Sequence, residues 1–515
     1  MDFNLLVEAL QVVFLPTNFA LIIMGMCLGV CFGTLPGISS SMGIVLMIPF
    51  TYYMGINASI IMLVAVYAGS AYGGSITAIL FNTPGTAESV ATTFDGYPMA
   101  QSGKAGKALG LAMSGSSFGG IFSVLVMLLL APALSVIALE IQSPEYFALT
   151  LLGMACISSV GSKDLPKALS TGLIGILIAL IGMDPMTGVS RLTFGQLNFL
   201  NGIEYIPIMI GSFAMAEVFK QVINRKTKNE KTTGDAGKVS LESISLKEFF
   251  KYKATVIKSA VIGTCVGILP GTGGSIASIV SYGEAARSSK NKEMFGKGAE
   301  EGVLAPETAN NAAGGGAMIP TLVLGIPGSP TTAIILAALV LQGLQPGPQL
   351  MAEQPLLLYC IFFSMLIASI VVFFSGRYAV KAFAAVLKLP YGLIAPMIVM
   401  FSIIGAYARS NDMFQIWVML AFGILGYFFS KFKFSAASLI LGIVLGNMME
   451  ESFRRQLLIS DGNFMSFFER PITVVILIAV VAVVLFPIIS NMKEKRKHKK
   501  QLLLNGLMLC TMYYR

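Results

Sequence analysis

The sequence predicts an all-α polytopic membrane protein, and three observations lead to that fold class. Of the 515 residues, 55% are hydrophobic and only 12% are charged, whereas a soluble domain carries about 25% charged residues. Apolar segments of about 20 residues, long enough to cross a hydrocarbon core of about 30 Å, recur along the chain. Many of the 53 glycine and 22 proline residues lie inside these segments, which is tolerated where protein or a wet cavity satisfies the freed backbone groups.

The candidate membrane helices follow from the apolar segments in chain order. These segments lie near residues 19–35, 38–56, 57–82, 108–131, 145–160, 166–183, 203–219, 254–269, 317–342, 355–376, 391–408, 413–430, 434–448 and 471–490. Several are too short to cross a bilayer, so we expect about 11–12 transmembrane helices. No basic stretch precedes the first segment, which favours a retained helix over a cleaved signal peptide.

A polar, basic segment divides the chain into two membrane units. We expect a first membrane unit at residues 1–219, a cytoplasmic basic loop at 220–253, a second membrane unit at 254–490 and a basic cytoplasmic tail at 491–515. The loop and the tail are rich in Lys and Arg, and such segments stay in the cytoplasm. We therefore attribute the net charge of +9 to membrane topology and expect a lipid bilayer, and no nucleic acid, as a partner.

The two membrane units repeat each other. LPG at Leu35–Gly37 recurs at Leu269–Gly271, and YGGSITAILFNTPGT at residues 72–86 matches GGGAMIPTLVLGIPGS at residues 314–329. Duplicated units with helices broken at matching positions are typical of secondary transporters, and the breaks mark the binding site. Residues 1–18 contain no Lys or Arg, whereas Lys251, Lys253 and Lys258 precede the second unit, so the charge bias predicts an inverted repeat.

Each break could form an anion site. Proline removes a backbone donor and glycine relaxes the limit on φ, so the helix unwinds and restarts with unpaired N–H groups at a positive dipole end. The candidate substrate-binding residues are Gly37, Ser39, Ser40 and Ser41; Asn82, Thr83, Gly85 and Thr86; Gly271, Thr272, Gly273, Gly274 and Ser275; and Gly328, Ser329, Thr331 and Thr332. The alternative is that the breaks serve packing and the hydroxyls bond the preceding turn.

The segment APETANNAAGGGAMIPT at residues 305–321 is the most polar candidate inside the membrane. Intramembrane carboxylates are costly and usually face a cavity or a partner, so Glu307 could hold a coupling cation or accept a proton, with Asn310 and Asn311 as oxygen ligands. The alternative places this segment at the membrane interface, with Glu307 exposed to water. The first unit has no equivalent acid, because we expect apolar IVLMIPF to fill that stretch.

The sequence argues against an enzyme. Its single histidine, His498, lies in the basic tail, which excludes Ser-His-Asp catalysis and disfavours an imidazole metal site. The six cysteines show no paired spacing outside the membrane, and ordinary packing explains them best. We expect no cofactor other than Na⁺ or H⁺ as a coupling ion, and no soluble nucleotide domain exists to drive transport with ATP.

The chain resembles the large membrane subunit of the tripartite tricarboxylate transporters. The resemblance rests on GTLPGISSSMGIVLMIPF, AYGGSITAILFNTPGT, GYPMAQSGKAGKALG, GILPGTGGSIASIVSYGEA and PETANNAAGGGAMIPTLVLGIPGSPTTA, and it covers residues 15–490. It implies a permease of the bacterial inner membrane for citrate and related carboxylates. It further implies a small four-helix membrane subunit and a periplasmic solute-binding protein as partners, an ion gradient, commonly of sodium, as the driving force, and an elevator-like architecture with re-entrant helices.

Two other functions remain open at this point. One is a self-sufficient organic-anion carrier or channel that needs no binding protein. The other is a non-transporting membrane scaffold or enzyme, which would leave the duplicated breaks unexplained.

Overall fold

The computed structural model describes residues 3–35, 38–160, 165–184, 186–224, 246–271, 273–386, 391–408 and 410–485. The prediction of an all-α polytopic membrane protein is confirmed, since helices dominate and the described strands form a single two-stranded hairpin. Gly37, Thr272, most of the predicted loop 220–253 and the whole tail 491–515 lie outside the described residues.

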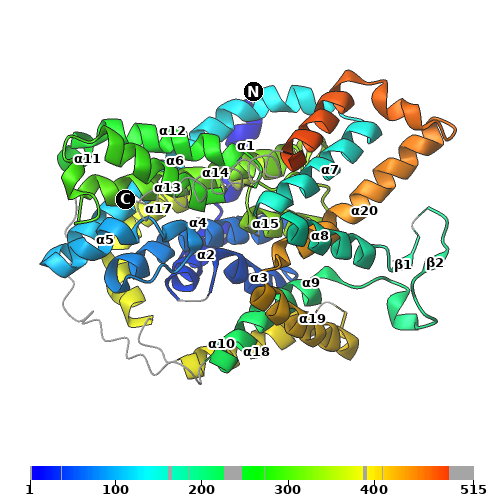
Figure 1. Ribbon diagram of the computed structural model, residues 1–515, viewed down its shortest axis with the longest axis horizontal. Helices are drawn as coiled ribbons and strands as arrows, with labels where there is room; N and C mark the ends of the chain where they lie inside the picture. The colour runs from blue at the N-terminus through cyan, green and yellow to red at the C-terminus, as the bar shows by residue number, and fades with distance from the viewer. Residues whose placement is uncertain are drawn as a thin grey trace, which may run out of the picture.

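The first half of the chain runs from α1 to α10 (Figure 1). Its α-helices are α1 (Phe3–Val13), α2 (Pro16–Thr34), α3 (Ser40–Thr51), α4 (Ile56–Phe81), α5 (Thr93–Met99), α6 (Ala105–Leu139), α7 (Ser143–Val160), α8 (Leu165–Ala179), α9 (Tyr205–Met209) and α10 (Ala216–Asn224). Short 3-10 or π-helical turns are η1 (Ala87–Ser89), η2 (Ala100–Lys104), η3 (Leu197–Phe199) and η4 (Ile210–Met215). The strands β1 (Gly182–Met183) and β2 (Ser190–Arg191) pair antiparallel between α8 and α9, a hairpin that the apolar pattern did not predict.

The second half runs from α11 to the last described helix. It comprises α11 (Leu246–Lys251), α12 (Lys253–Ile268), α13 (Gly273–Ser288), η7 (Lys292–Met294), α14 (Glu300–Val323), α15 (Pro330–Leu341), α16 (Pro348–Glu353), α17 (Pro355–Val386), α18 (Tyr391–Ala408), α19 (Met413–Phe432), α20 (Ala436–Ile459), η8 (Phe464–Phe468) and an apolar helix at Pro471–Leu485. Hydropathy missed α13 and the first two-thirds of α14, because these helices carry small and polar residues. They pack against each other inside the protein, where such residues are tolerated.

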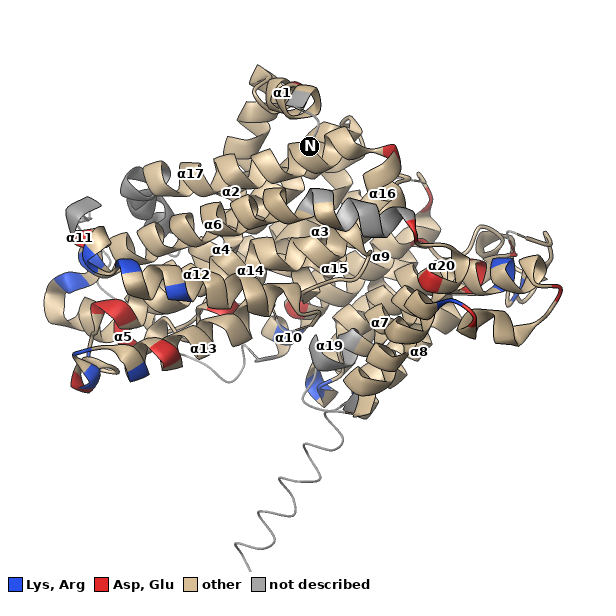
Figure 2. Ribbon diagram, turned by 90° about the horizontal axis from the view of Figure 1, so that it is seen from above, with Lys and Arg blue, Asp and Glu red and all other residues tan. Residues whose placement is uncertain are grey.

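Seven helices of the described chain are long and apolar enough to cross a membrane, and six further apolar helices have 10–17 residues. The sequence predicted about 11–12 crossings, so the expected number is reached only if shorter helices contribute. In Figure 2, Lys, Arg, Asp and Glu gather toward the two ends of the long axis, whereas the middle carries few charges. This separation of charge from the apolar middle suits a protein surrounded by lipid.

Glycine residues bring the paired helices of both units into backbone contact. On α2, a Cβ at Gly25 would lie 2.7 Å from the carbonyl oxygen of Met62 on α4, and Gly29 and Gly33 approach α4 more closely. In the second unit, Gly263 and Gly267 of α12 approach the backbone of α14 in the same way. Small residues at such interfaces allow close packing, which is the main attraction between helices in lipid. Each unit thus holds its broken helix against one long buried helix.

Candidate functional site

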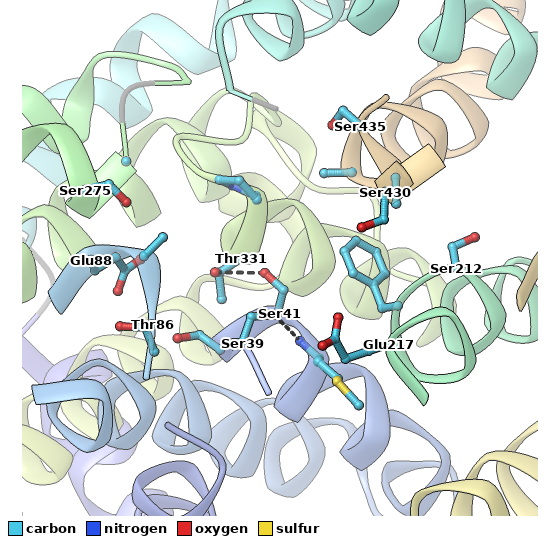
Figure 3. A pocket seen from close by; sticks show the side chains of 18 of the residues that line it. Ser39, Ser41, Thr86, Glu88, Ser212, Glu217, Ser275, Thr331, Ser430 and Ser435 are labelled. Carbon is cyan, nitrogen blue, oxygen red and sulfur yellow. Dashed lines mark hydrogen bonds between the residues drawn. The ribbon is translucent and has the colours of Figure 1, made fainter. Parts of the chain in front are cut away.

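The four helices α3, α13, α15 and α20 begin around one pocket of about 510 Å³ (Figure 3). That volume suits a small organic ligand, since such sites usually measure about 300–1,000 Å³. Nine of the predicted substrate-binding residues line it: Ser39, Ser40, Ser41, Thr86, Gly271, Gly273, Gly274, Ser275 and Thr331. Residues predicted from four separate breaks therefore meet in space, although they span almost 300 positions of the sequence.

The first break of one unit meets the second break of the other. The hydroxyls of Ser41, at the start of α3, and Thr331, at the start of α15, lie 3.1 Å apart. On the other side of the pocket, η1 follows the second break of the first unit and packs against α13. The two units therefore cross over at the pocket, so that neither unit could form it alone.

Side-chain caps fix where these helices begin. The Oγ of Ser39 accepts a hydrogen bond from the N–H of Met42 at 3.2 Å, and Ser435 accepts one from the N–H of Ser438 at 3.2 Å. Each cap satisfies one orphan donor of its helix and leaves the other first-turn N–H groups at a positive dipole end. The helix starts therefore present positive potential to the pocket without a basic side chain.

Six predicted residues lie outside the pocket lining, which corrects the prediction that all of them face one site. They are Asn82, Thr83, Gly85, Gly328, Ser329 and Thr332. Asn82 ends α4 in the left-handed conformation, and Ser329 and Thr332 are used in the capping box of α15. Gly85 and Gly328 pack against neighbouring backbone, so the absence of a side chain allows each turn to pack this closely.

Five polar residues of the pocket were missed by the sequence analysis: Glu88, Ser212, Glu217, Ser430 and Ser435. Ser212 and Glu217 come from the π-helical turn η4 and from α10, whereas Ser430 and Ser435 flank the connection from α19 to α20. Ser435 carried a usable signal, because a serine directly before the apolar run AASLILGIVLG is a typical N-cap. Glu88 follows Thr86 of the second break by two residues. Ser212, Glu217 and Ser430 had no local signal, since only tertiary packing brings them to the breaks.

Two hydroxyls of the pocket have no partner. The Oγ atoms of Ser40 and Ser212 are buried without a hydrogen bond, and each residue is only 4% exposed. Buried polar groups normally have a hydrogen-bond partner, so two buried hydroxyls without one at the same pocket indicate a place for a polar ligand. Hydroxyls at helix N-termini can donate to an anion such as a carboxylate.

The charges of the pocket are unexpected for an anion site. Its lining contains Glu88 and Glu217 but no Lys or Arg. The carboxylate of Glu217 is paired, since the Nζ of Lys220 lies 3.1 Å away and the Nε2 of Gln221 donates to it at 3.0 Å. Glu88 has neither an ion pair nor a hydrogen bond to its carboxyl within the described residues.

Glu307 lies behind the pocket at the centre of a hydroxyl cluster. Its carboxylate accepts hydrogen bonds from Ser75 at 2.6 Å, from Ser116 at 3.0 Å and from Thr92. The residue is 0% exposed, which is inconsistent with the alternative that placed it in water at the interface. Ser75 and Ser116 come from α4 and α6, so the first unit supplies the donors for this acid of the second unit.

The predicted partners of Glu307 lie nearby and are incompletely satisfied. The Nδ2 of Asn311 donates to the Oδ1 of Asn310 at 2.5 Å and to the backbone oxygen of Glu307 at 3.1 Å. The Nδ2 of Asn310 and the hydroxyl of Tyr72 are buried without a partner. A cation at this place could be held only by oxygen atoms such as those of Glu307 and Asn310, because the Nδ2 of Asn310 is a donor. Within the described residues, no three His, Cys, Asp or Glu side chains are grouped to bind a metal.

The position equivalent to Glu307 in the first unit is apolar. Glu307 lies 20 residues before Pro327, and Val64 lies 20 residues before Pro84. Val64 is buried in α4, so the equivalent stretch lies in this helix and not in IVLMIPF of α3, where the sequence analysis placed it. The reason is that each unit inserts a second helix, α3 or α13, between its first break and its long buried helix.

Similarity to known proteins identifies the family of the chain. The family model described as "Tripartite tricarboxylate transporter TctA family" matches residues 19–441. The chain belongs to the TctA family. The four breaks of this TctA-family protein all lie within the matched residues.

Two relatives of this TctA-family protein come from Agrobacterium vitis. An uncharacterised 52.8 kDa protein of the TAR-I ttuC' 3' region is 37% identical over 481 residues, which cover 93% of this chain and 95% of that protein. An uncharacterised protein of the TAR-II ttuC' 3' region is 38% identical over 234 residues, which cover 45% of this chain and 97% of that protein. No solved structure matches the chain.

Proposed function

We propose that this chain is the permease subunit of a binding-protein-dependent tripartite system. It carries tricarboxylates and dicarboxylates such as citrate across the bacterial inner membrane as a secondary transporter. Membership of the TctA family supports the substrate class. The observation that carries the proposal is the pocket itself, where four helix starts converge on the unpaired hydroxyls of Ser40 and Ser212.

The pocket suits carboxylates for a physical reason. First-turn N–H groups and hydroxyls donate hydrogen bonds, and the aligned peptide dipoles favour negative charge by about half an elementary charge per helix. The hydroxyls of Ser41 and Thr331, one from each unit, lie side by side, and Ser39 and Ser275 offer further hydroxyls of the pocket (Figure 3). A ligand with two or three carboxylates could engage several of these helix starts at once.

The driving force in this proposal is a cation gradient, with Na⁺ or H⁺ as the coupling ion. Glu307, Asn310 and Asn311 form the coupling-ion site, in which side-chain oxygen atoms would hold the cation, and the burial of Glu307 supports this assignment. Because Glu307 takes its hydroxyl donors from the first unit, the cation would join the two units. An elevator-like movement of the broken helices would then carry substrate and ion together.

The proposed partners are a small four-helix membrane subunit and a periplasmic solute-binding protein. The test is the uptake of labelled citrate, tartrate and succinate into vesicles that contain the chain with both partners, with and without a sodium or proton gradient. We expect accumulation that needs the gradient and disappears when the binding protein is omitted. Accumulation without the binding protein would favour a self-sufficient carrier, downhill flux alone would favour a channel, and no uptake of any carboxylate would refute the proposal.

Substitutions test the pocket assignment directly. Ser41→Ala and Thr331→Ala remove two facing hydroxyls and should abolish or strongly reduce uptake while the protein remains inserted. Ser170→Ala is the matched control, because this exposed hydroxyl bonds only its own helix backbone. Normal uptake by both pocket variants would refute the assignment of the substrate site.

A further inference from the structure

Glu88 lies where a substrate carboxylate would be expected. It belongs to η1 and lines the pocket beside the start of α13 (Figure 3). A Cβ built on Gly274, in the first turn of α13, would lie 3.2 Å from the carboxyl carbon of Glu88. The first turn of a helix attracts negative charge, so the protein places its own carboxyl group next to one of the proposed anion-binding helix starts.

Glu88 differs from the other acid of the pocket in lacking a counter-charge. Glu217 is paired with Lys220. By contrast, no Lys or Arg of the described chain lies within ion-pair distance of Glu88. A carboxylate without a partner in a mostly protein-lined space is costly, and a second carboxylate from a ligand would increase that cost.

The elements that pack against η1 supply no positive charge. They are α4, α13 and α14. Tyr67 of α4 and Glu307 of α14 each interact electrostatically with Glu88, and the hydroxyl of Tyr67 is hydrogen-bonded to Ser329. The charged side chains of α13 are engaged elsewhere, since Arg287 pairs with Glu284 at the far end of that helix. Tyr72 of α4 interacts with Glu307. Glu300 and Glu301, at the start of α14, accept hydrogen bonds from Tyr252 and Thr255 at the start of α12.

We propose that Glu88 makes carboxylate binding depend on a cation. In this proposal, which rests on the proposed function, the pocket accepts a carboxylate only after a proton or Na⁺ has neutralised Glu88. The cation is taken up from solution and forms an O–H bond or an ionic contact at the carboxylate. No other bond changes. Substrate and cation then move together, because the pocket binds neither the substrate carboxylate nor the cation well in the absence of the other.

Two further observations point to a ligand at this place. The buried hydroxyls of Ser40 and Ser212 line the same pocket without a partner. Both hydroxyls have no protein partner while Glu88 occupies the start of α13. The electrostatic link between Glu88 and Glu307 also gives the pocket a connection to the proposed coupling-ion site.

The experiment measures equilibrium binding of labelled citrate to the purified full chain with its small subunit. One series varies pH without Na⁺, and a second varies Na⁺ at a fixed high pH, so that the two cations are distinguished. Unmodified protein should bind more tightly as one of the two cations increases. Glu88→Gln should bind about tenfold tighter or more at high pH without Na⁺ and should lose most of that cation dependence.

Three further variants test whether the charge of Glu88 causes the cation dependence. Glu88→Asp retains the charge and should retain the cation dependence, whereas Glu284→Gln removes a surface charge on α13 and should behave as the unmodified protein. Gly274→Ala crowds the carboxyl of Glu88 without changing charge and should weaken or shift the cation dependence. Monodisperse elution and unchanged melting confirm that each variant is folded.

The outcomes separate the two proposals. If the unmodified protein binds citrate and Glu88→Gln shows the same cation dependence, the role of Glu88 is refuted and the proposed function stands. If the unmodified protein binds no carboxylate under any condition, both the proposed function and the role of Glu88 are refuted.

Discussion

The close contact between α2 and α4 yields a prediction whose size can be worked out. A Cβ on Gly25 would lie 2.7 Å from the carbonyl oxygen of Met62 and 3.1 Å from the Cβ of Ala65. Ordinary contact requires about 3.3 Å or more, so Gly25→Ala must separate the helices by about 0.6 Å. A gap of that size forfeits about a quarter to a half of the attraction across the affected contacts.

The expected cost follows from that separation. Overpacking of a well-packed interface costs about 1–3 kcal/mol, and the loss extends along the helix because Gly29 and Gly33 contact the same partner. Alanine also favours a helix over glycine by about 1 kcal/mol, which offsets part of the loss. We expect Gly25→Ala to be destabilising by up to about 2 kcal/mol.

Gly283→Ala is the matched control. Gly283 lies in α13 and nothing lies within 4 Å of its built Cβ, so alanine should be neutral or stabilising by up to about 1 kcal/mol. Thermal unfolding of the purified protein in detergent, followed by helical signal and by the monodisperse fraction, compares the two variants. The packing argument is refuted if Gly25→Ala melts at or above the temperature of Gly283→Ala.

Three further predictions concern charged groups. Glu307→Gln should change the Na⁺ or pH dependence of uptake, and an unchanged profile would remove Glu307 from the coupling-ion site. Asp95 of α5 accepts the N–H groups of Gly298 and Ala299 at the start of α14, both at 2.8 Å, so Asp95→Ala should lower stability by about 1–2 kcal/mol and Asp95→Asn by less, as melting would show. Outside the membrane, hydrogen bonds from Thr187 and from the N–H of Met186, together with Arg454, hold the pKa of Asp184 well below its usual range. Because the pKa is lowered on folding, this stabilisation of the β1–β2 hairpin is present above about pH 4 and is lost as the pH falls further. The protection of hairpin amides relative to their intrinsic exchange rate should therefore fall in acid, and equal protection at low pH would contradict the ion pair.

The fold class followed from the sequence because lipid imposes a simple rule. A chain with 55% hydrophobic residues and recurring apolar segments must satisfy its backbone internally, which in these segments means helices. Hydropathy did not detect the helices that lie mainly against other protein elements, where the rule does not apply. Helix α14 is largely buried among other protein elements, and α13 buries its small and polar face while Ile276, Ile279 and Val280 are exposed, so their Gly, Ser and Asn residues lie where contact with lipid is not required.

The breaks were also visible in the sequence, but their use was not. Proline and glycine mark each helix break in the local sequence. Nine of the residues predicted from these breaks line the pocket. Whether a hydroxyl faces a ligand or caps its own helix depends on the side-chain direction, which distinguishes Ser41 from Ser329. No local pattern carries that information.

What the sequence determined by itself is the membrane class, the duplicated breaks and most of the hydroxyls at one pocket. The tertiary structure alone decided that the breaks cross over between the units, since Ser41 and Thr331 are 290 residues apart. It also decided the charge of the site: Glu217 enters from a segment with no motif, and only the neighbours of the two acids show that Glu217 is paired and Glu88 is not. The physical reason is that hydrophobicity and backbone breaks act over a few residues, whereas electrostatic pairing depends on which distant segments the packing brings together.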